Sequence, residues 1–204
     1  MSPKIAAADV KALRERTGAA MMDCKSALSE AGGDMEKAVE LLRVKGQASA
    51  AKRSGRSTGE GIVSSYVHAT GKIGVLVEVQ CETDFVARND DFRAFASEVA
   101  LHVAAAAPRY VAAADVPAGE EASERAVFER KAAEEGKPEN VRERIVEGQI
   151  AKWRKEIALL EQEHVNADKH GGKTIEELRQ EASAKTGENI RIARFARFEV
   201  GADG

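Results

Sequence analysis

The chain has 204 residues, which is enough for one sizeable hydrophobic core or two small ones. Its 31 basic and 34 acidic residues give a formal net charge of −3, so the overall charge points neither to nucleic acid nor to a membrane surface. Cys24 and Cys81 lie far apart without a CxxC companion, and no segment approaches membrane-spanning length. We therefore expect a cytoplasmic protein with reduced thiols.

The first 46 residues predict a compact module of three short helices. Asp9 is a suitable N-cap for the first helix, and the second is expected from about residue 22 to residue 31. The segment Gly32-Gly33-Asp34 ends the second helix and caps the third, whose apolar residues between 38 and 42 share one face. Such a short segment has few core residues, so the module is small.

Residues 47–60 are rich in Gly, Ser, Ala and basic residues and predict a linker, with a helical tendency near residues 48–52. Two strands then follow, over residues 62–68 and 73–79, with a turn signal of Ala-Thr-Gly-Lys between them. In the second strand apolar residues alternate with others, which is typical of a half-buried strand. The sequence therefore predicts a β-hairpin directly after the linker.

Helical spacing of apolar residues predicts a helix over about residues 90–107. The segment 118–162 predicts two charged helices separated by Gly136-Lys137-Pro138, which favours an antiparallel helical hairpin. A capping box at residue 174 predicts a helix to about residue 185, and the alternating segment 189–200 predicts a last strand.

Residues 61–204 together predict an α/β core domain, which we expect to be the dimerisation domain and to include the helical hairpin. The fold class is α+β, with a small antiparallel three-stranded sheet covered by helices. A single sheet of this size is a thin core for such a long chain, and it leaves an edge and an apolar face that need covering.

The run Thr83-Asp84-Phe85-Val86-Ala87-Arg88-Asn89-Asp90 lies where the second strand ends and a helical pattern begins. Asp84 is able to cap the coming helix while Phe85 fills the core below it. Alternatively both side chains project from a tip and present an acid and an aromatic wedge to a partner. Composition and periodicity do not choose between these two interpretations.

Three segments resemble those of the bacterial elongation factor Ts family, the nucleotide-exchange factors of the GTPase elongation factor Tu. Residues 83–89 (TDFVARN) look like the family signature, residues 13–25 (LRERTGAAMMDCK) resemble its amino-terminal motif, and residues 195–201 (FARFEVG) resemble its closing strand. Their order and spacing match, and with the helical hairpin the resemblance covers nearly the whole chain. It implies that the three-helix module is similar to ubiquitin-associated domains.

The resemblance implies a non-catalytic exchange factor that needs no cofactor. A tip inserted near the Mg²⁺ and phosphates of the GTPase would promote GDP release and stabilise the nucleotide-free state. Longer members carry two α/β subdomains where this chain has room for one, so we expect a homodimer. The implied partner-binding residues are Thr83, Asp84, Phe85 and Val86 in the tip, and Met21 and Met22 in the amino-terminal module. Of the two methionines, we expect one to pack inward.

Other functions are less consistent with the sequence. A module for RNA or ribosome binding would use the basic residues at 52–56 and the Arg-rich last strand, but the charge balance and the scarcity of aromatic residues argue against it. An enzyme using Asp84 with a histidine has no supporting spacing. His164, Asp168 and His170 lie close together in sequence, yet chance groupings are common in polar loops, and we expect no metal site there.

Overall fold

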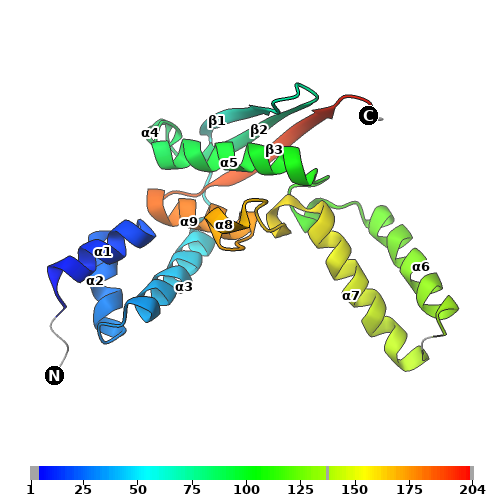
Figure 1. The fold of residues 1–204 in the computed structure, drawn as a ribbon, viewed down its shortest axis with the longest axis horizontal. Coiled ribbons are helices and arrows are strands. Elements are labelled where there is room, and N and C mark those ends of the chain that lie inside the picture. Colours follow the sequence, from blue (N-terminus) through cyan, green and yellow to red (C-terminus); the bar gives the residue numbers. More distant parts are fainter. Residues whose placement is uncertain (1–4, 137, 203–204) are drawn as a thin grey trace. The chain divides into compact units, whose positions relative to one another are not determined.

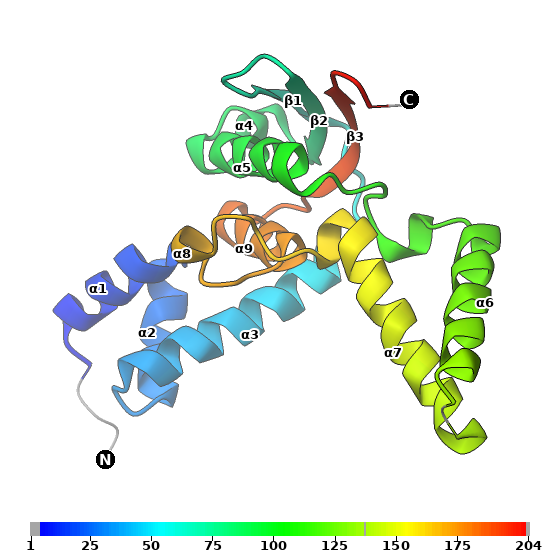
Figure 2. The same ribbon diagram turned by 45° about the vertical axis from the view of Figure 1, so that its right-hand side comes forward.

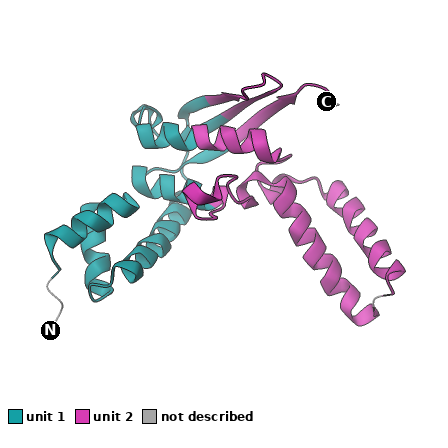
Figure 3. Cartoon of the chain, viewed as in Figure 1, with its two compact units in different colours: residues 1–63, 78–96, 177–192 teal, residues 64–77, 97–176, 193–204 magenta. Residues whose placement is uncertain are grey.

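The structure is a computed structural model that describes residues 5–136 and 138–202 (Figure 1). The first four residues of the predicted module and Lys137 of the predicted helix break lie outside the described residues. Contacts divide the chain into two compact units (Figure 3). One consists of residues 1–63, 78–96 and 177–192, and the other of residues 64–77, 97–176 and 193–204.

The fold class is the one predicted, a mixture of helices and one three-stranded antiparallel sheet with strand order β1-β2-β3. Two 3₁₀ turns, η1 and η2, flank the helical hairpin. No helix in the described part of the chain is long and apolar enough to cross a membrane. The elements are α1 (Ala7–Thr17), α2 (Met21–Glu30), α3 (Met35–Arg53), β1 (Glu60–Val67), β2 (Ile73–Cys81), α4 (Asp84–Ala87), α5 (Asp90–Ala106), η1 (Ala113–Asp115), α6 (Ala118–Glu134), α7 (Glu139–Ile157), η2 (Leu159–Glu161), α8 (Ala167–His170), α9 (Ile175–Thr186) and β3 (Arg191–Glu199).

The first three helices pack around one small core. Asp34 caps α3 as predicted, because its side chain accepts hydrogen bonds from the backbone N–H groups of Glu36 and Lys37. Asp9 is not an N-cap: α1 begins at Ala7, so this acid lies in the first turn, where it still opposes the positive end of the helix dipole. The buried residues of this core are Val10, Leu13, Cys24, Ala27, Leu28, Ala38 and Leu42.

The third helix is longer than the sequence predicts, since it continues to Arg53 and covers part of the segment 47–60. Packing against α9 accounts for the extension. Ala50 is fully buried, and a side chain at Gly46 would come within 3.4 Å of Ala184 on α9. Small residues let the two helices approach closely, and a Gly/Ala-rich stretch that reads as a linker becomes helix. The division into a module, a linker and a core domain stays a prediction.

The sheet and α5 are formed where predicted. Val75, Val77 and Val79 on β2 are buried, in keeping with the alternating pattern. Helix α5 runs along one face of the sheet (Figures 1 and 2). It buries Phe92 and Val99 among other apolar residues at helical spacing.

Helices α6 and α7 form the predicted antiparallel hairpin. Its contacts are largely polar on the α6 side, where Ala132 is the buried residue, while α7 buries Val146 and Ile150. Ion pairs join the helices: Arg154 binds Glu121 at 2.6 Å, and Arg125 binds Glu147 at 2.5 Å. An arm with so little apolar surface relies on its partner helix for stability.

Candidate functional site

The tip, residues 83–86, lies in the short connection between β2 and α5. Thr83 has an extended backbone, and its side-chain oxygen accepts a hydrogen bond from the N–H of Val86 at 3.5 Å, which closes the helical turn α4. Ala87 is buried beneath this turn, whereas Phe85 is 81% exposed. The turn is thus anchored on its inner side and presents an aromatic ring to solvent.

The structure contradicts the interpretation in which Asp84 caps the helix and Phe85 fills the core. Asn89 caps α5 instead, because its Oδ1 accepts a hydrogen bond from the N–H of Asp91 at 2.8 Å. The Asp84 carboxylate forms an ion pair with Arg88 at 2.9 Å that is largely solvent-exposed and contributes little to stability. Because the Phe85 ring lies in solvent, it fills no part of the core, and packing within this chain does not account for its position.

Glu188 and Glu82 are the residues at this site that sequence reasoning missed. The carboxylate of Glu188, between α9 and β3, accepts hydrogen bonds from the N–H groups of Glu82 and Thr83, each at 3.0 Å, and from the Thr83 hydroxyl at 2.6 Å. More than one hundred residues separate these partners, and local periodicity carries no signal for such a contact. Only the tertiary structure brings them together.

Both methionines of the amino-terminal module are exposed, Met21 by 45% and Met22 by 71%. The expectation that one of them packs inward is therefore wrong. The buried face of α2 consists of Cys24, Ala27 and Leu28, and the helix begins at Met21. The two methionines lie at the helix start, beyond the edge of the small core, and form an exposed apolar pair of flexible side chains.

Two basic residues considered for RNA binding contact their own chain. Arg53 donates a hydrogen bond to the carbonyl oxygen of Ser183 at 3.4 Å, and Arg56 lies 3.4 Å from the carboxylate of Glu82. The charge of Arg56 is partly neutralised by Glu82, and no aromatic platform accompanies the two arginines in this segment. This arrangement adds no support to nucleic-acid binding.

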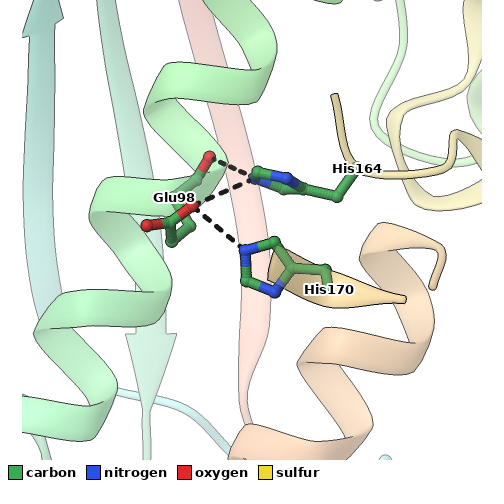
Figure 4. A group of neighbouring side chains, drawn as sticks. All are labelled: Glu98, His164 and His170. Carbon is green, nitrogen blue, oxygen red and sulfur yellow. Dashed lines mark hydrogen bonds and ion pairs between the residues drawn. The ribbon is translucent and has the colours of Figure 1, made fainter. Parts of the chain in front are cut away.

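Two histidines of the segment 164–170 lie next to Glu98 of α5 (Figure 4). His170 Nε2 lies 3.1 Å from the Glu98 carboxylate, and His164 Nε2 lies 3.2 Å from the Glu98 carbonyl oxygen and 3.4 Å from its carboxylate. Lys169 also binds this carboxylate. Sequence reasoning grouped the two histidines with Asp168, whereas the structure groups them with an acid on a distant helix.

The hydrogen bonds of His164 favour a proton, and not a metal ion, on its Nε2 atom. Its Nδ1 accepts the N–H of Asn166 at 3.1 Å, so the ring proton belongs on Nε2, where the Glu98 carbonyl oxygen accepts it. A metal ion bound to Nε2 would need the lone pair of that atom and would force a proton onto Nδ1, facing another donor. Although Glu98, His164 and His170 are close enough to share an ion, the donor pattern opposes it.

Burial changes the protonation of this cluster. It lowers the pKa of His164, against the opposing effect of the hydrogen bond to the Glu98 carbonyl oxygen, and it lowers the pKa of His102 in spite of the hydrogen bond to Gln162. The pKa of Glu98 is raised by burial, but hydrogen bonds from Lys169 and His170 outweigh this and hold it below the ordinary value. At neutral pH the buried rings are therefore uncharged beside an ionised carboxylate.

We predict that stability falls as pH is lowered from about 7 to about 5. His102 and His164 have lowered pKa values in the folded state, so the unfolded chain binds more protons in this range and is favoured. The slope for each histidine is at most about 1.4 kcal/mol per pH unit. Urea unfolding across this range measures it. His164→Gln, which cannot titrate, should flatten the dependence, although Glu98, Lys169 and His170 still face the site.

Stability that is unchanged or rises toward pH 5 would contradict this interpretation of the cluster. The same samples test the metal alternative. A large rise in melting temperature on adding Zn²⁺, absent in His164→Gln, would show that the lone pair of His164 is available after all.

The buried thiol of Cys81 is unsuited to nucleophilic chemistry. Burial, followed by the negative charge of Glu188, raises its pKa to about 11. Because the thiolate is the reactive form, this cysteine is inert at neutral pH. Cys24 is also buried and free.

Comparison with known proteins identifies the family. The family model described as Elongation factor TS matches residues 7–171. The chain is 55% identical over 197 residues to Elongation factor Ts of Thermoanaerobacter sp. (strain X514), covering 97% of this chain and 95% of that protein. It is 54% identical over 198 residues to Elongation factor Ts of Desulfitobacterium hafniense and 53% identical over 197 residues to that of Geobacter metallireducens, each covering 97% of this chain and 90% of the relative. On these matches, the chain belongs to the elongation factor Ts family.

Proposed function

We propose that this chain is a guanine-nucleotide exchange factor that binds elongation factor Tu·GDP in the cytoplasm and promotes release of GDP during translation elongation. Membership of the elongation factor Ts family supports the general function. We assign the action to the tip, residues 83–86. The single observation that carries this assignment is the exposed ring of Phe85 on a helical turn that is anchored from below.

An exchange factor of this kind acts by differential binding. A GTPase holds its nucleotide through a phosphate-binding loop, a Mg²⁺ ion and ordered switch segments. A partner that binds the nucleotide-free GTPase more tightly than the GDP-bound form weakens GDP by the same factor. No covalent bond is made or broken, so the exchange factor itself needs neither a general acid nor a nucleophile, and we propose that it is not an enzyme.

The tip offers two kinds of contact for this purpose. Phe85 would insert between elements that hold the Mg²⁺ side of the GTPase site, and burying such a ring is worth about 1.5–3 kcal/mol. Asp84 would place a negative charge and two acceptor oxygens near the metal and the phosphates, where they compete for the same cation. Thr83 and Val86 complete the turn that carries both side chains.

The amino-terminal module would supply a second contact. Met21 and Met22 expose flexible apolar side chains at the start of α2, and methionine adapts well to the irregular surface of a partner. This contact would contribute affinity, whereas the tip would act on the nucleotide site. Truncating the methionines should therefore weaken binding more than it slows release at saturating concentration.

We also propose a homodimer, in which the outer face of the sheet is covered by a second copy. Exposed apolar residues gather on this face: hydrogen bonds between the strands place Val67 and Phe198 on either side of Gly74, next to Leu76. Exposed apolar patches on a sheet are typical of an interface. An isologous contact would bring two tips into one assembly.

Light scattering at micromolar concentration tests the dimer. We expect twice the chain mass of 21.9 kDa, and a shift toward the monomer in Val67→Lys because a charge would be buried at the interface. Val127→Lys is the matched control, because Val127 is also apolar and exposed but lies on α6 and not on the sheet. A mass of one chain for the wild type at these concentrations would contradict the dimer.

The experiment that tests the exchange function measures release of labelled GDP from elongation factor Tu after addition of excess unlabelled nucleotide. We expect strong acceleration by the wild-type chain at substoichiometric amounts, because the factor is regenerated when GTP binds. Release that proceeds at the intrinsic rate in its presence would contradict the proposed function.

A further inference from the structure

Glu188 lies in the segment between α9 and β3 and accepts three hydrogen bonds from Glu82 and Thr83, where the tip begins. Two come from the backbone N–H groups of Glu82 and Thr83, and the third comes from the Thr83 hydroxyl. Hydrogen bonds to a carboxylate are stronger than those between neutral groups. The end of β2 is therefore held at one point by a side chain that is remote in sequence.

The segment that follows β2 and the segment between α9 and β3 are joined by hydrogen bonds in both directions. The carboxylate of Glu82 accepts the backbone N–H of Asn189 at 2.6 Å, while the carboxylate of Glu188 accepts the backbone N–H of Glu82. The Asn189 side chain donates to the carbonyl oxygen of Arg56 at 2.9 Å, and Ser183 donates to that of Glu188 at 2.6 Å. Glu188 is thus itself fixed by neighbours on both sides.

The Thr83 hydroxyl connects the hydrogen bonds of Glu188 to the helical turn α4. A hydroxyl has one proton, and the Thr83 hydroxyl donates it in the hydrogen bond to Glu188. A lone pair of the same oxygen is then free to accept the N–H of Val86. The orientation of the cap on α4 therefore depends on Glu188. A turn of four residues is too short to be stable by itself, so its conformation relies on such contacts.

We propose that Glu188 is a positioning residue for nucleotide exchange, which orients the Asp84-Phe85 tip through Thr83 without contacting the partner's nucleotide site. This inference rests on the function proposed for the tip. A wedge must arrive in one conformation, since a loose tip loses affinity to the entropy of ordering, roughly two- to twelvefold for each side chain that must be immobilised on binding.

The test measures release of labelled GDP from elongation factor Tu at saturating concentrations of full-length variants. We expect Glu188→Ala to slow release by about fivefold to a hundredfold, since two side chains of the tip must then be ordered on binding, and Glu188→Gln, which keeps one acceptor oxygen, to recover part of the loss. Glu129→Ala removes the same charge from an exposed position on α6 and should leave release unchanged. The apparent affinity for the GTPase should change less than the rate, because the methionine contact remains.

Two further measurements separate positioning from a general loss of structure. Hydrogen exchange of the Thr83 and Val86 amides should accelerate in Glu188→Ala while that of α1–α3 stays unchanged. Thr83→Val, which removes the linking hydroxyl, should resemble Glu188→Ala, whereas Thr83→Ser should retain more activity than Thr83→Val. Wild-type release rates in both Glu188→Ala and Thr83→Val would overturn the inference.

A double-mutant comparison distinguishes this inference from the proposed function itself. In a variant with both Asp84→Ala and Phe85→Ala, adding Glu188→Ala should cause no further slowing, since the residue acts through the tip. Further slowing by the same factor would overturn the positioning role while leaving the tip in place. Wild-type release by the Asp84→Ala, Phe85→Ala variant alone would overturn the function of the tip, and the inference with it.

Discussion

Replacing Phe85 with alanine is expected to remove most of the acceleration of GDP release from elongation factor Tu while leaving the stability of the chain unchanged. The ring is 81% exposed, so its loss creates no cavity in this chain. If the ring is buried in the GTPase only in the nucleotide-free complex, its removal costs about 1.5–3 kcal/mol of the differential binding. That corresponds to a loss of roughly ten- to 150-fold in release rate.

The measurement combines labelled-GDP release with thermal unfolding of the same samples. Val141→Ala is the matched control, because Val141 is also apolar and exposed but lies on α7. This variant should promote GDP release at the wild-type rate. Equal release by Phe85→Ala and the wild type would refute the wedge assignment. A fall in melting temperature comparable with that of a core variant would show instead that Phe85 supports the fold.

Replacing Phe92 with alanine is expected to have the opposite effect. This ring, seven residues along the chain and on α5, is fully buried. Its truncation leaves a cavity and loses apolar burial, which together destabilise a protein by about 3–5 kcal/mol. Urea unfolding measures the change, and Phe92→Leu, which fills much of the same volume, should lose considerably less.

At a temperature where Phe92→Ala is still folded, its rate of GDP release per folded molecule should be close to that of the wild type. A free energy of unfolding within about 1 kcal/mol of the wild-type value would contradict the burial of this ring. The two variants thus distinguish Phe85, which is expected to contact the GTPase, from Phe92, which stabilises the core.

Sequence periodicity predicted the elements whose signals are local. The alternation in β2, the helical spacing in α5 and the Gly-Pro break between α6 and α7 each depend on residues within one or two turns of each other. The family resemblance rested on short motifs of the same kind, and the comparisons confirm it. The predicted cap at Asp34 is also correct, because a cap involves only its next few neighbours.

The predictions made from the sequence were wrong where packing between distant segments decides the structure. Helix α3 extends to Arg53 because α9 lies against its small residues, and both methionines are exposed because α2 buries a face that does not include them. The histidines of the 164–170 segment meet Glu98 rather than Asp168. In each case the partner is tens of residues away, beyond the reach of periodicity.

The sequence by itself determined the family, the three-stranded sheet, the helical hairpin and the position of the tip between β2 and α5, since all of these follow from local pattern or motif. Composition and periodicity left open whether Asp84 caps a helix and Phe85 fills the core or both stand exposed, and the family resemblance favoured an exposed tip. Only the tertiary structure decided this, through Asn89 as the cap of α5, Ala87 beneath the turn and Glu188 from more than one hundred residues away. Burial is a property of the assembled chain, and a short motif does not contain it.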